Sequence, residues 1–254
     1  MILKSLSLTI GFIVAVFAVG CRPSEPRANA EPPTVAGTNV SDDTPVALEA
    51  KEGASVEGPK LMPADEAAKD PTLVEFRERL LEAVRSRDEE FLFEAIDPNI
   101  RTGFGPVGGA TEFRRHWRLD TADSPLWDEL ETILALGGSF NPSSASSQFW
   151  APYVYSAWPE QHDAFRSLAV IEEDVPMHES PDPQSPVIGR LSYDIVKNVD
   201  VPAAELAAGW TRVRTVDGRS GWVNSLTVRS PVGYRAGFTR RNGEWKLSAF
   251  VSGD

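Results

Sequence analysis

Few residues of this 254-residue chain have the types and spacing that acid–base, thiol or metal chemistry requires. The histidines are His116, His162 and His178, and the single cysteine is Cys21. A catalytic zinc site needs histidines and a carboxylate in a compact motif, but these histidines form no HxH or HxxxH pair. Cys21 follows directly after an N-terminal apolar segment, outside any predicted domain. We therefore expect no metal, no cofactor and no catalytic residue, and we predict that the chain is not an enzyme.

The acidic and glycine-rich clusters have simpler interpretations than catalysis. Residues 172–174 (Glu-Glu-Asp) are most simply a charged loop. The run GFGPVGG at 103–109 lacks the lysine of a phosphate-binding P-loop and is interrupted by Pro106, so we interpret it as a turn. An enzyme is the alternative if folding places Asp97 or His116 inside a pocket of the first domain.

Aromatic side chains are the stronger candidates for a site, because flat rings supply contact area at a low cost in conformational entropy. We predict a ligand-binding role for Trp210, Trp222 and Tyr193, which lie in a β-rich part of the chain. The alternative for each ring is a place in the core. The run FWAPYVY at 149–155 has enough rings to stack on sugars or a peptide, and we favour a core role for it.

The net charge of the chain restricts the classes of partner that it can bind. The formal net charge is −12 at pH 7. A nucleic-acid partner requires a basic surface that displaces counterions from phosphate, so we expect no nucleic-acid binding. The same sign of charge repels an anionic lipid surface. Any partner held by electrostatics is therefore basic or neutral.

The first 20 residues have the pattern of an export signal peptide (1–20). Lys4 precedes an apolar run over 10–19, which is shorter than the about 20 residues of a membrane span. The ending AVGC at 18–21 resembles the lipobox of bacterial lipoproteins, in which the signal is cut before the cysteine and the cysteine is acylated. The resemblance implies lipidation of Cys21 and an exported protein anchored in the cell envelope. In a cell with two membranes, Arg22 favours the outer membrane, facing the periplasm. The alternative is an ordinary secretory signal.

Two regions follow the signal. Residues 21–70 are predicted to be a disordered tether, because they are rich in Pro, Glu, Ala and Ser and contain no aromatic side chain. Residues 71–166 are predicted to be a helix-rich α+β domain. Asp70 is a suitable N-cap, and Pro71 fits the first helical position. Apolar residues then recur at helical spacing, at Leu73, Phe76, Leu80 and Val84.

The stretch 209–223, GWTRVRTVDGRSGWV, predicts a β-hairpin around Asp217-Gly218, because glycine takes a positive φ without a steric clash. It resembles the central hairpin of bacterial SH3 (SH3b) domains, and the upstream phrase ESPDPQSPVIGRLS resembles their first half. The resemblance covers 168–229, with His178 in place of a usual basic residue and Tyr193-Asp194 in place of a usual glycine. It implies an SH3-like β-barrel over 167–230 that binds a cell-wall peptide or an envelope protein.

Residues 231–254 predict an extra C-terminal β-hairpin, with Asn242-Gly243 at its turn and apolar residues alternating along both strands. This hairpin either extends the barrel or packs on 71–166. The early helices followed by a final strand bear a faint resemblance to cystatin-like domains of the nuclear-transport-factor type, which is consistent with the second arrangement. The predicted fold is α+β, with a helix-rich N-terminal domain, an SH3-like β-barrel and the extra hairpin.

These expectations combine into one functional hypothesis and two alternatives. We expect a non-catalytic cell-envelope lipoprotein, held in the membrane by its N-terminal lipid, whose SH3b-like domain binds a cell-wall peptide or an envelope protein. The first alternative is a structural or assembly lipoprotein that uses the helical domain as its interface. The second is an enzyme with a cystatin-like pocket in the N-terminal domain.

Overall fold

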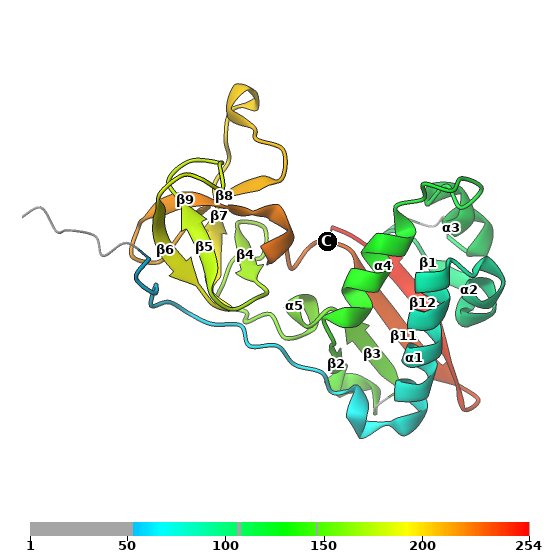
Figure 1. Cartoon of the computed structure of the whole chain (residues 1–254). Coiled ribbons are helices and arrows are strands. Elements are labelled where there is room, and N and C mark those ends of the chain that lie inside the picture. The colour runs from blue at the N-terminus through cyan, green and yellow to red at the C-terminus, as the bar shows by residue number, and fades with distance from the viewer. Residues whose placement is uncertain (1–52, 106–107, 146, 254) are drawn as a thin grey trace, which may run out of the picture. The chain divides into compact units, whose positions relative to one another are not determined.

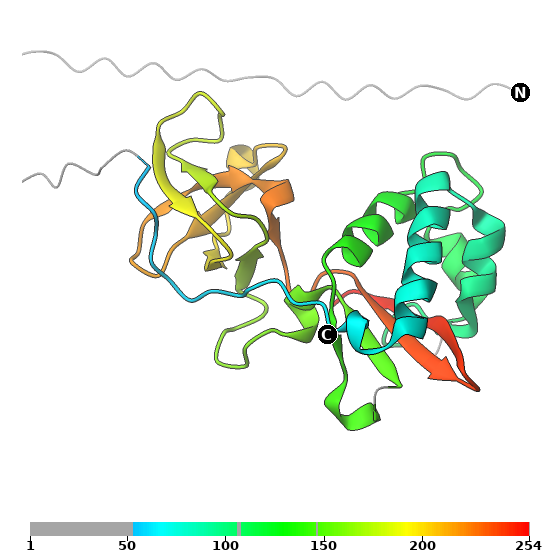
Figure 2. The same cartoon turned by 60° about the horizontal axis from the view of Figure 1, so that its bottom comes forward.

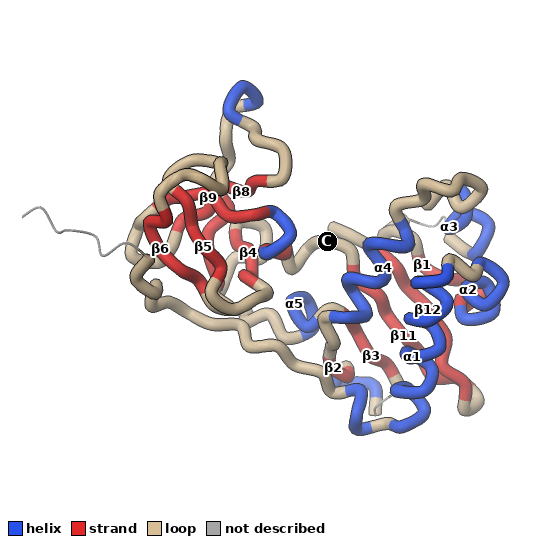
Figure 3. The backbone as a smooth tube through the Cα atoms, in the orientation of Figure 1, coloured by secondary structure: helices blue, strands red, loops and turns tan. Residues whose placement is uncertain are grey.

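The computed structural model describes residues 53–105, 108–145 and 147–253 (Figure 1). The expected signal peptide, Cys21 and residues 21–52 of the expected tether lie outside the described residues. The described residues form helices and two β-sheets, so the fold is α+β. Figure 3 shows that the longer helices accompany one of the two sheets.

The first sheet has five strands in the order β1-β12-β11-β3-β2. They are β1 (Ile96–Arg101), β2 (Ser139–Phe140), β3 (Gln148–Ala151), β11 (Arg235–Arg241) and β12 (Glu244–Val251). β1 runs parallel to β12, and the other neighbours are antiparallel. The C-terminal hairpin β11–β12 therefore pairs with strands from 71–166 and not with the second sheet.

The two longest helices cover one face of this sheet. The helical segments are η1 (Ala67–Lys69), α1 (Pro71–Ser86), α2 (Glu89–Ala95), α3 (Ala110–His116), α4 (Leu126–Ala135), η2 (Pro142–Ser144) and α5 (Tyr153–Ser156). α1 and α4 lie over the strands in Figure 1, and the turned view of Figure 2 shows both helices on the same face. Asp88 caps α2 by accepting a hydrogen bond from the Phe91 backbone N–H, as Asp70 does for Thr72 at α1.

The core of this part lies between the helices and the sheet. Strand residues alternate between the two faces, so the facing pair Phe149 and Phe238 is fully buried against the helices. The next pair, Trp150 and Gly237, faces the opposite side. The helices and β12 supply other members of the same cluster: Leu73, Phe76, Leu80, Leu130, Ile133, Leu247 and Phe250.

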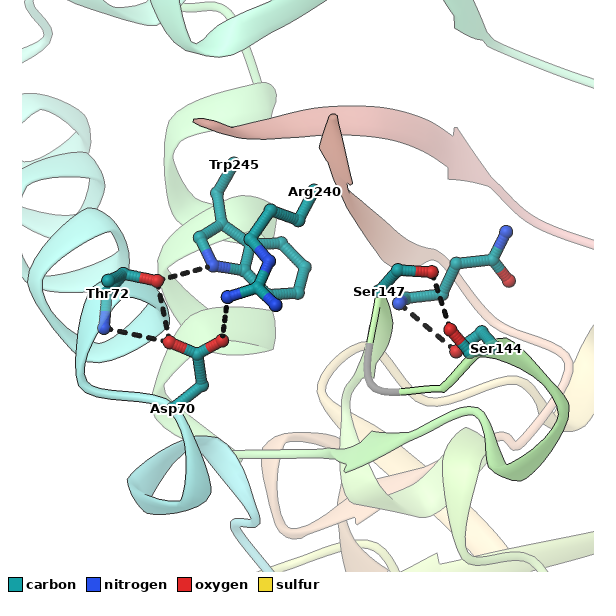
Figure 4. Close-up of polar contacts among 7 residues, drawn as sticks. Asp70, Thr72, Ser144, Ser147, Arg240 and Trp245 are labelled. Atoms are coloured by element: carbon teal, nitrogen blue, oxygen red, sulfur yellow. Dashed lines mark hydrogen bonds and ion pairs between the residues drawn. The ribbon is translucent and has the colours of Figure 1, made fainter. Parts of the chain in front are cut away.

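Asp70 joins the start of α1 to the β11–β12 hairpin (Figure 4). Its Oδ1 accepts from the Thr72 backbone N–H at 2.9 Å and from Thr72 Oγ1 at 2.6 Å, and its Oδ2 accepts from Arg240 Nη1 at 2.7 Å. Trp245 Nε1 donates to Thr72 Oγ1 at 3.1 Å. The hydrogen bonds from Thr72 and the charge of Arg240 lower the pKa of the Asp70 carboxyl from its ordinary 3.8.

The second sheet has seven strands in the order β10-β4-β7-β8-β9-β5-β6. They are β4 (Ser167–Val170), β5 (Val175–His178), β6 (Val187–Leu191), β7 (Ile195–Asn198), β8 (Trp210–Arg214), β9 (Ser220–Asn224) and β10 (Val228–Arg229), with η3 (Ala203–Glu205) and η4 (Ser225–Thr227) between strands. Its core includes Val175, Met177, Val213 and Val223. β10 and β6 are the two ends of the order, so the described strands do not close into the expected barrel.

Residues 53–70 differ from the expected tether. The backbone N–H of Val56 donates to the Arg190 carbonyl at 2.9 Å, and that of Leu61 to the Tyr193 carbonyl at 2.8 Å. The side chains of Val56 and Leu61 are 2% and 5% exposed. The prediction of disorder is therefore wrong for 53–70, because these apolar residues are buried by strands that lie far away in the sequence.

The first prediction tests this burial. Leu61→Ala removes a side chain that packs with Tyr153, Val154, Ala169 and Ile195. We expect it to lower the free energy of unfolding by roughly 2–5 kcal/mol, as for other buried leucines. Met62→Ala is the control, because Met62 is 58% exposed, and its effect should stay within about 0.5 kcal/mol. Equal effects of the two substitutions in urea unfolding would contradict the packing of this segment.

The second prediction concerns Asp70. Asp70→Ala should cost about 1–2 kcal/mol of stability through the lost cap. Asp70→Asn keeps an N-cap oxygen but loses the ion pair with Arg240. Its loss of stability should therefore be smaller than that of Asp70→Ala and should depend on pH. Because folding lowers the pKa of Asp70, its charge stabilises the fold above the ordinary pKa of 3.8, and this contribution is lost as the pH falls through the lowered value.

The measurement is urea unfolding of wild type and Asp70→Asn at pH 7 and at successively lower pH. The difference between them should shrink below the ordinary carboxyl pKa. Asp88→Asn is the matched control: this cap has no ion-pair partner among the described residues, so its difference from wild type should be small at every pH. A constant difference for Asp70→Asn would rule out a contribution from the ion pair.

Candidate functional site

Trp210 and Trp222 lie on the outer face of the hairpin β8–β9. In the antiparallel pairing, Trp210 faces Asn224 and Arg212 faces Trp222. Facing residues share one side of a sheet, and alternate residues take the other. Val213 and Val223 take that other side and are fully buried in the core. The two tryptophans are therefore outside this core.

Trp222 is nevertheless covered. It is 8% exposed, and the Arg212 guanidinium carbon lies 5.9 Å from the centre of its ring. His178 faces it from β5, and this histidine is 6% exposed. His178 Nδ1 lies 2.9 Å from the Ser185 carbonyl oxygen, which only accepts, so Nδ1 carries the hydrogen in this contact. Trp222 mainly packs the outer face of the sheet and offers little surface to a ligand.

Trp210 is half-buried, and the exposed leucines Leu206 and Leu226 lie in the segments that lead to the Trp210 end of the hairpin. Its ring meets that of His178 edge to face, with centroids 5.3 Å apart. The Trp210 backbone N–H donates to the Ala207 carbonyl at 3.1 Å, which holds the loop that carries Leu206. Figure 3 shows this loop projecting from the ends of β7 and β8.

Leu226 lies at the Trp210 end of the β8–β9 hairpin, because the backbone N–H of the preceding residue, Ser225, donates to the Gly209 carbonyl at 2.9 Å. Leu206 is 68% exposed and Leu226 is 82% exposed. Arg212 and Glu205 add a pair of charges, with Nη1 and Oε2 3.8 Å apart. We name the group Leu206, Trp210, Arg212 and Leu226 the Trp210 surface.

Tyr193 does not join the Trp210 surface. Its backbone N–H donates to the Glu172 carbonyl at 3.1 Å, and its own carbonyl accepts from Leu61. Tyr193 follows the end of β6 at Leu191. Leu191 pairs with Val175 at the first residue of β5, whereas Trp222 pairs with His178 at the last residue of β5. Tyr193 has a φ of +56°, so this residue holds the left-handed turn at which the SH3b resemblance implies a glycine.

The turn of the β8–β9 hairpin is held by its own side chains. Hydrogen bonds from Arg219 and Thr215 lower the pKa of Asp217 to about 2. Arg219 Nε donates to Asp217 Oδ2 at 2.8 Å, and Arg219 Nη1 donates to the Ile188 carbonyl at 3.0 Å. This arrangement fixes the strand register that places Trp210 opposite Asn224.

A second candidate site is a hollow of about 200 Å³ on the face of the five-stranded sheet that the helices leave open. We name it the Trp150 hollow. Its lining includes the indole of Trp150 and several polar side chains: Asp97, Asn99, Arg101, Gln148, Thr239, Arg241 and Ser248. Sequence reasoning placed Trp150 in the core, but the alternation along β3 buries Phe149 and turns Trp150 outward.

The alternative enzyme site required Asp97 or His116 inside a pocket of the first domain. Between helices and sheet the space is filled by the apolar cluster around Leu80 and Phe238. Asp97 lines the hollow on the opposite face, where its Oδ2 lies 3.3 Å from Arg241 Nη1. His116 is exposed, with Nε2 3.1 Å from the Tyr234 hydroxyl, and does not line that hollow.

Two further hollows lie beside α1. One, of about 360 Å³, is bordered by α2 and the hairpin turn and has a mixed charged rim that includes Glu75, Arg79 and Lys246. The other, of about 370 Å³, is more apolar and is lined by Val74, Leu81 and Leu134 among others. The second resembles a docking groove more than a site for chemistry, because its lining is mainly apolar.

Metal-binding and membrane-spanning features are described for residues 53–105, 108–145 and 147–253. No three His, Cys, Asp or Glu side chains in these ranges gather closely enough to hold a metal ion. None of the helices described there has the length and apolar character needed to cross a bilayer. A scan against models of known protein families and a search of curated proteins both find no match to this chain.

Proposed function

We propose that the protein is a non-catalytic cell-envelope lipoprotein whose SH3b-like domain binds a cell-wall peptide or an envelope protein through the Trp210 surface. In this proposal the lipid on Cys21 holds the protein at the membrane, and the seven-stranded sheet is the SH3b-like unit. The observation that carries the proposal is that exposed leucines lie in the two segments next to a half-buried indole, at one end of the β8–β9 hairpin. Leu206 and Leu226 are 68% and 82% exposed there.

The Trp210 surface has the features of an interface hot spot. A tryptophan with one side supported by the protein loses little entropy on binding and removes a large apolar area from water. Trp210 is supported in this way by His178, and Arg212 with Glu205 adds charges at the rim. A short peptide segment fits this arrangement, because its apolar side chains can cover Leu206 and Leu226 while its polar backbone meets the charged pair.

Two features support the SH3b-like assignment. The predicted Asp217-Gly218 turn closes the β8–β9 hairpin, and Gly218 has a φ of +88°. The positive φ at Tyr193 matches the conformation that the usual glycine of this position would take.

The assembly alternative has one observation in its favour, the apolar hollow lined by Val74, Leu81 and Leu134. In that version the helical domain docks a partner and the seven-stranded sheet only stabilises it. A single experiment separates the two versions.

The experiment is a pull-down of the exported protein on purified sacculi and on detergent-solubilised envelope proteins. Trp210→Ala should reduce retention by roughly fivefold or more, because hot-spot residues contribute more than about 1 kcal/mol. Leu226→Ser should reduce it as well. The matched control is Val216→Ser, because Val216 is 69% exposed at the other end of the same hairpin, and this substitution should leave retention unchanged.

Each variant must first give the circular dichroism spectrum and the melting temperature of a folded protein. Retention that is equal for Trp210→Ala and wild type would refute the Trp210 surface. Loss of retention in Leu81→Glu, with normal retention in Trp210→Ala, would establish the assembly alternative instead. Failure of the wild-type protein to bind either preparation would refute the binding function itself.

A further inference from the structure

We propose that the Trp150 hollow binds one neutral pyranose unit of a glycan, stacked on the Trp150 indole. This site is on the five-stranded sheet and uses none of the residues of the Trp210 surface. Binding of a sugar there would therefore be independent of a ligand on the Trp210 surface.

The indole of Trp150 is placed as a flat platform. A Cβ at Gly237 would lie 2.8 Å from two carbon atoms of the indole, so the six-membered ring of Trp150 lies directly on the glycine backbone. Tyr155 meets the same indole edge to face, with centroids 5.5 Å apart. A ring that rests on backbone and is contacted by a tyrosine loses little freedom when a ligand stacks on it.

The rim of the hollow supplies both hydrogen-bond donors and acceptors. Asp97 is 7% exposed, and its Oδ1 accepts from the Asn99 backbone N–H at 2.8 Å, which leaves further lone pairs on both carboxylate oxygens. Thr239 Oγ1 and Ser248 Oγ lie 2.7 Å apart in the same lining, and Ser248 Oγ also donates to the Gly237 carbonyl at 3.1 Å. Arg101, Asn99 and Gln148 complete the lining with planar polar groups.

This combination fits a pyranose better than other small ligands. A pyranose has an apolar C–H face that covers an aromatic ring and a rim of hydroxyl groups that both donate and accept hydrogen bonds. The volume of about 200 Å³ is below the roughly 300–1,000 Å³ of sites for drug-sized ligands, so a single ring fits. The hollow is open to solvent, so the ring can belong to a longer chain.

The overall charge of the chain favours a neutral sugar, and the lining of the hollow favours binding without cleavage. The net charge of −12 acts at long range against an acidic polysaccharide, and within the lining Arg241 is already paired with Asp97 at 3.3 Å, which leaves Arg101 as the other guanidinium group. Glycoside hydrolysis usually requires two carboxyl groups across the scissile bond. The lining of this hollow contains one, Asp97. The geometry therefore supports recognition of a glycan.

The test is saturation-transfer NMR with the full chain and three soluble probes: cellotetraose, N-acetylchitotetraose and oligogalacturonate. At least one neutral probe should receive saturation at its ring C–H protons, and the anionic probe should receive less. The comparison of the two neutral probes decides whether an acetamido group contributes. No transfer to either neutral probe, or stronger transfer to oligogalacturonate, would overturn the proposal.

Trp150→Ala should abolish the transfer, whereas Trp158→Ala is the matched control, because Trp158 does not line the hollow. If Trp150→Ala fails to fold, Asp97→Asn and Thr239→Val replace it. Asp97→Asn should weaken binding by about tenfold, since it removes a charge-assisted acceptor. Binding that survives unchanged in every folded variant of the hollow would also overturn the proposal.

Trp210→Ala distinguishes this proposal from the function proposed above. This variant should bind the neutral tetrasaccharide as wild type does, whatever the outcome of the sacculus experiment. Loss of tetrasaccharide binding in Trp210→Ala, with normal binding in Trp150→Ala, would place the sugar on the Trp210 surface and refute the Trp150 hollow.

Discussion

The pairing of β11 with β3 and of β12 with β1 is the constraint on which the helical part of the chain depends. These strands occupy the middle of the five-stranded sheet although they come last in the sequence. The core under α1 is incomplete without Phe238, Leu247 and Phe250, because they belong to the same buried cluster as Leu80. Asp70 adds a polar link between α1 and Arg240 of the same hairpin. The fold of this domain therefore depends on contacts between residues far apart in the sequence more than on any single helix.

This pairing also explains how the second sheet is accommodated. β3 and β11 are neighbours in the five-stranded sheet, so the chain between them leaves and returns at adjacent strands. The seven-stranded sheet is therefore an insertion, and its core around Val213 is separate from the core around Phe238. Residues 53–56 lie along β6, where Ser55 bridges to Arg190. They cover an end strand that would otherwise expose unpaired backbone groups.

The sequence predicts features that depend on local chemistry and misses those that depend on distant partners. Asp70 with Pro71 marks the start of α1, and Asn242-Gly243 marks the turn of the last hairpin, because caps and turns are set by adjacent residues. Local patterns do not predict which sheet the last hairpin joins. The alternation of apolar residues along its strands suits pairing with either sheet. Val56 and Leu61 likewise lack a local pattern, and their burial depends on β6 and on the turn at Tyr193.

The candidate sites show the same limit at the level of single rings. Trp210 and Trp222 both lie on the outer face of one hairpin, yet neighbouring residues bury Trp222 more than Trp210. β9 has β8 on one side and β5 on the other, and His178 faces Trp222 from β5. β7 pairs with β8 only at Val213 and Arg214, so the Trp210 end of β8 has a strand on one side. An indole there keeps part of its surface in water. Which tryptophan can meet a ligand is therefore decided by where the neighbouring strand ends, and the alternation of residues within the hairpin does not contain that information.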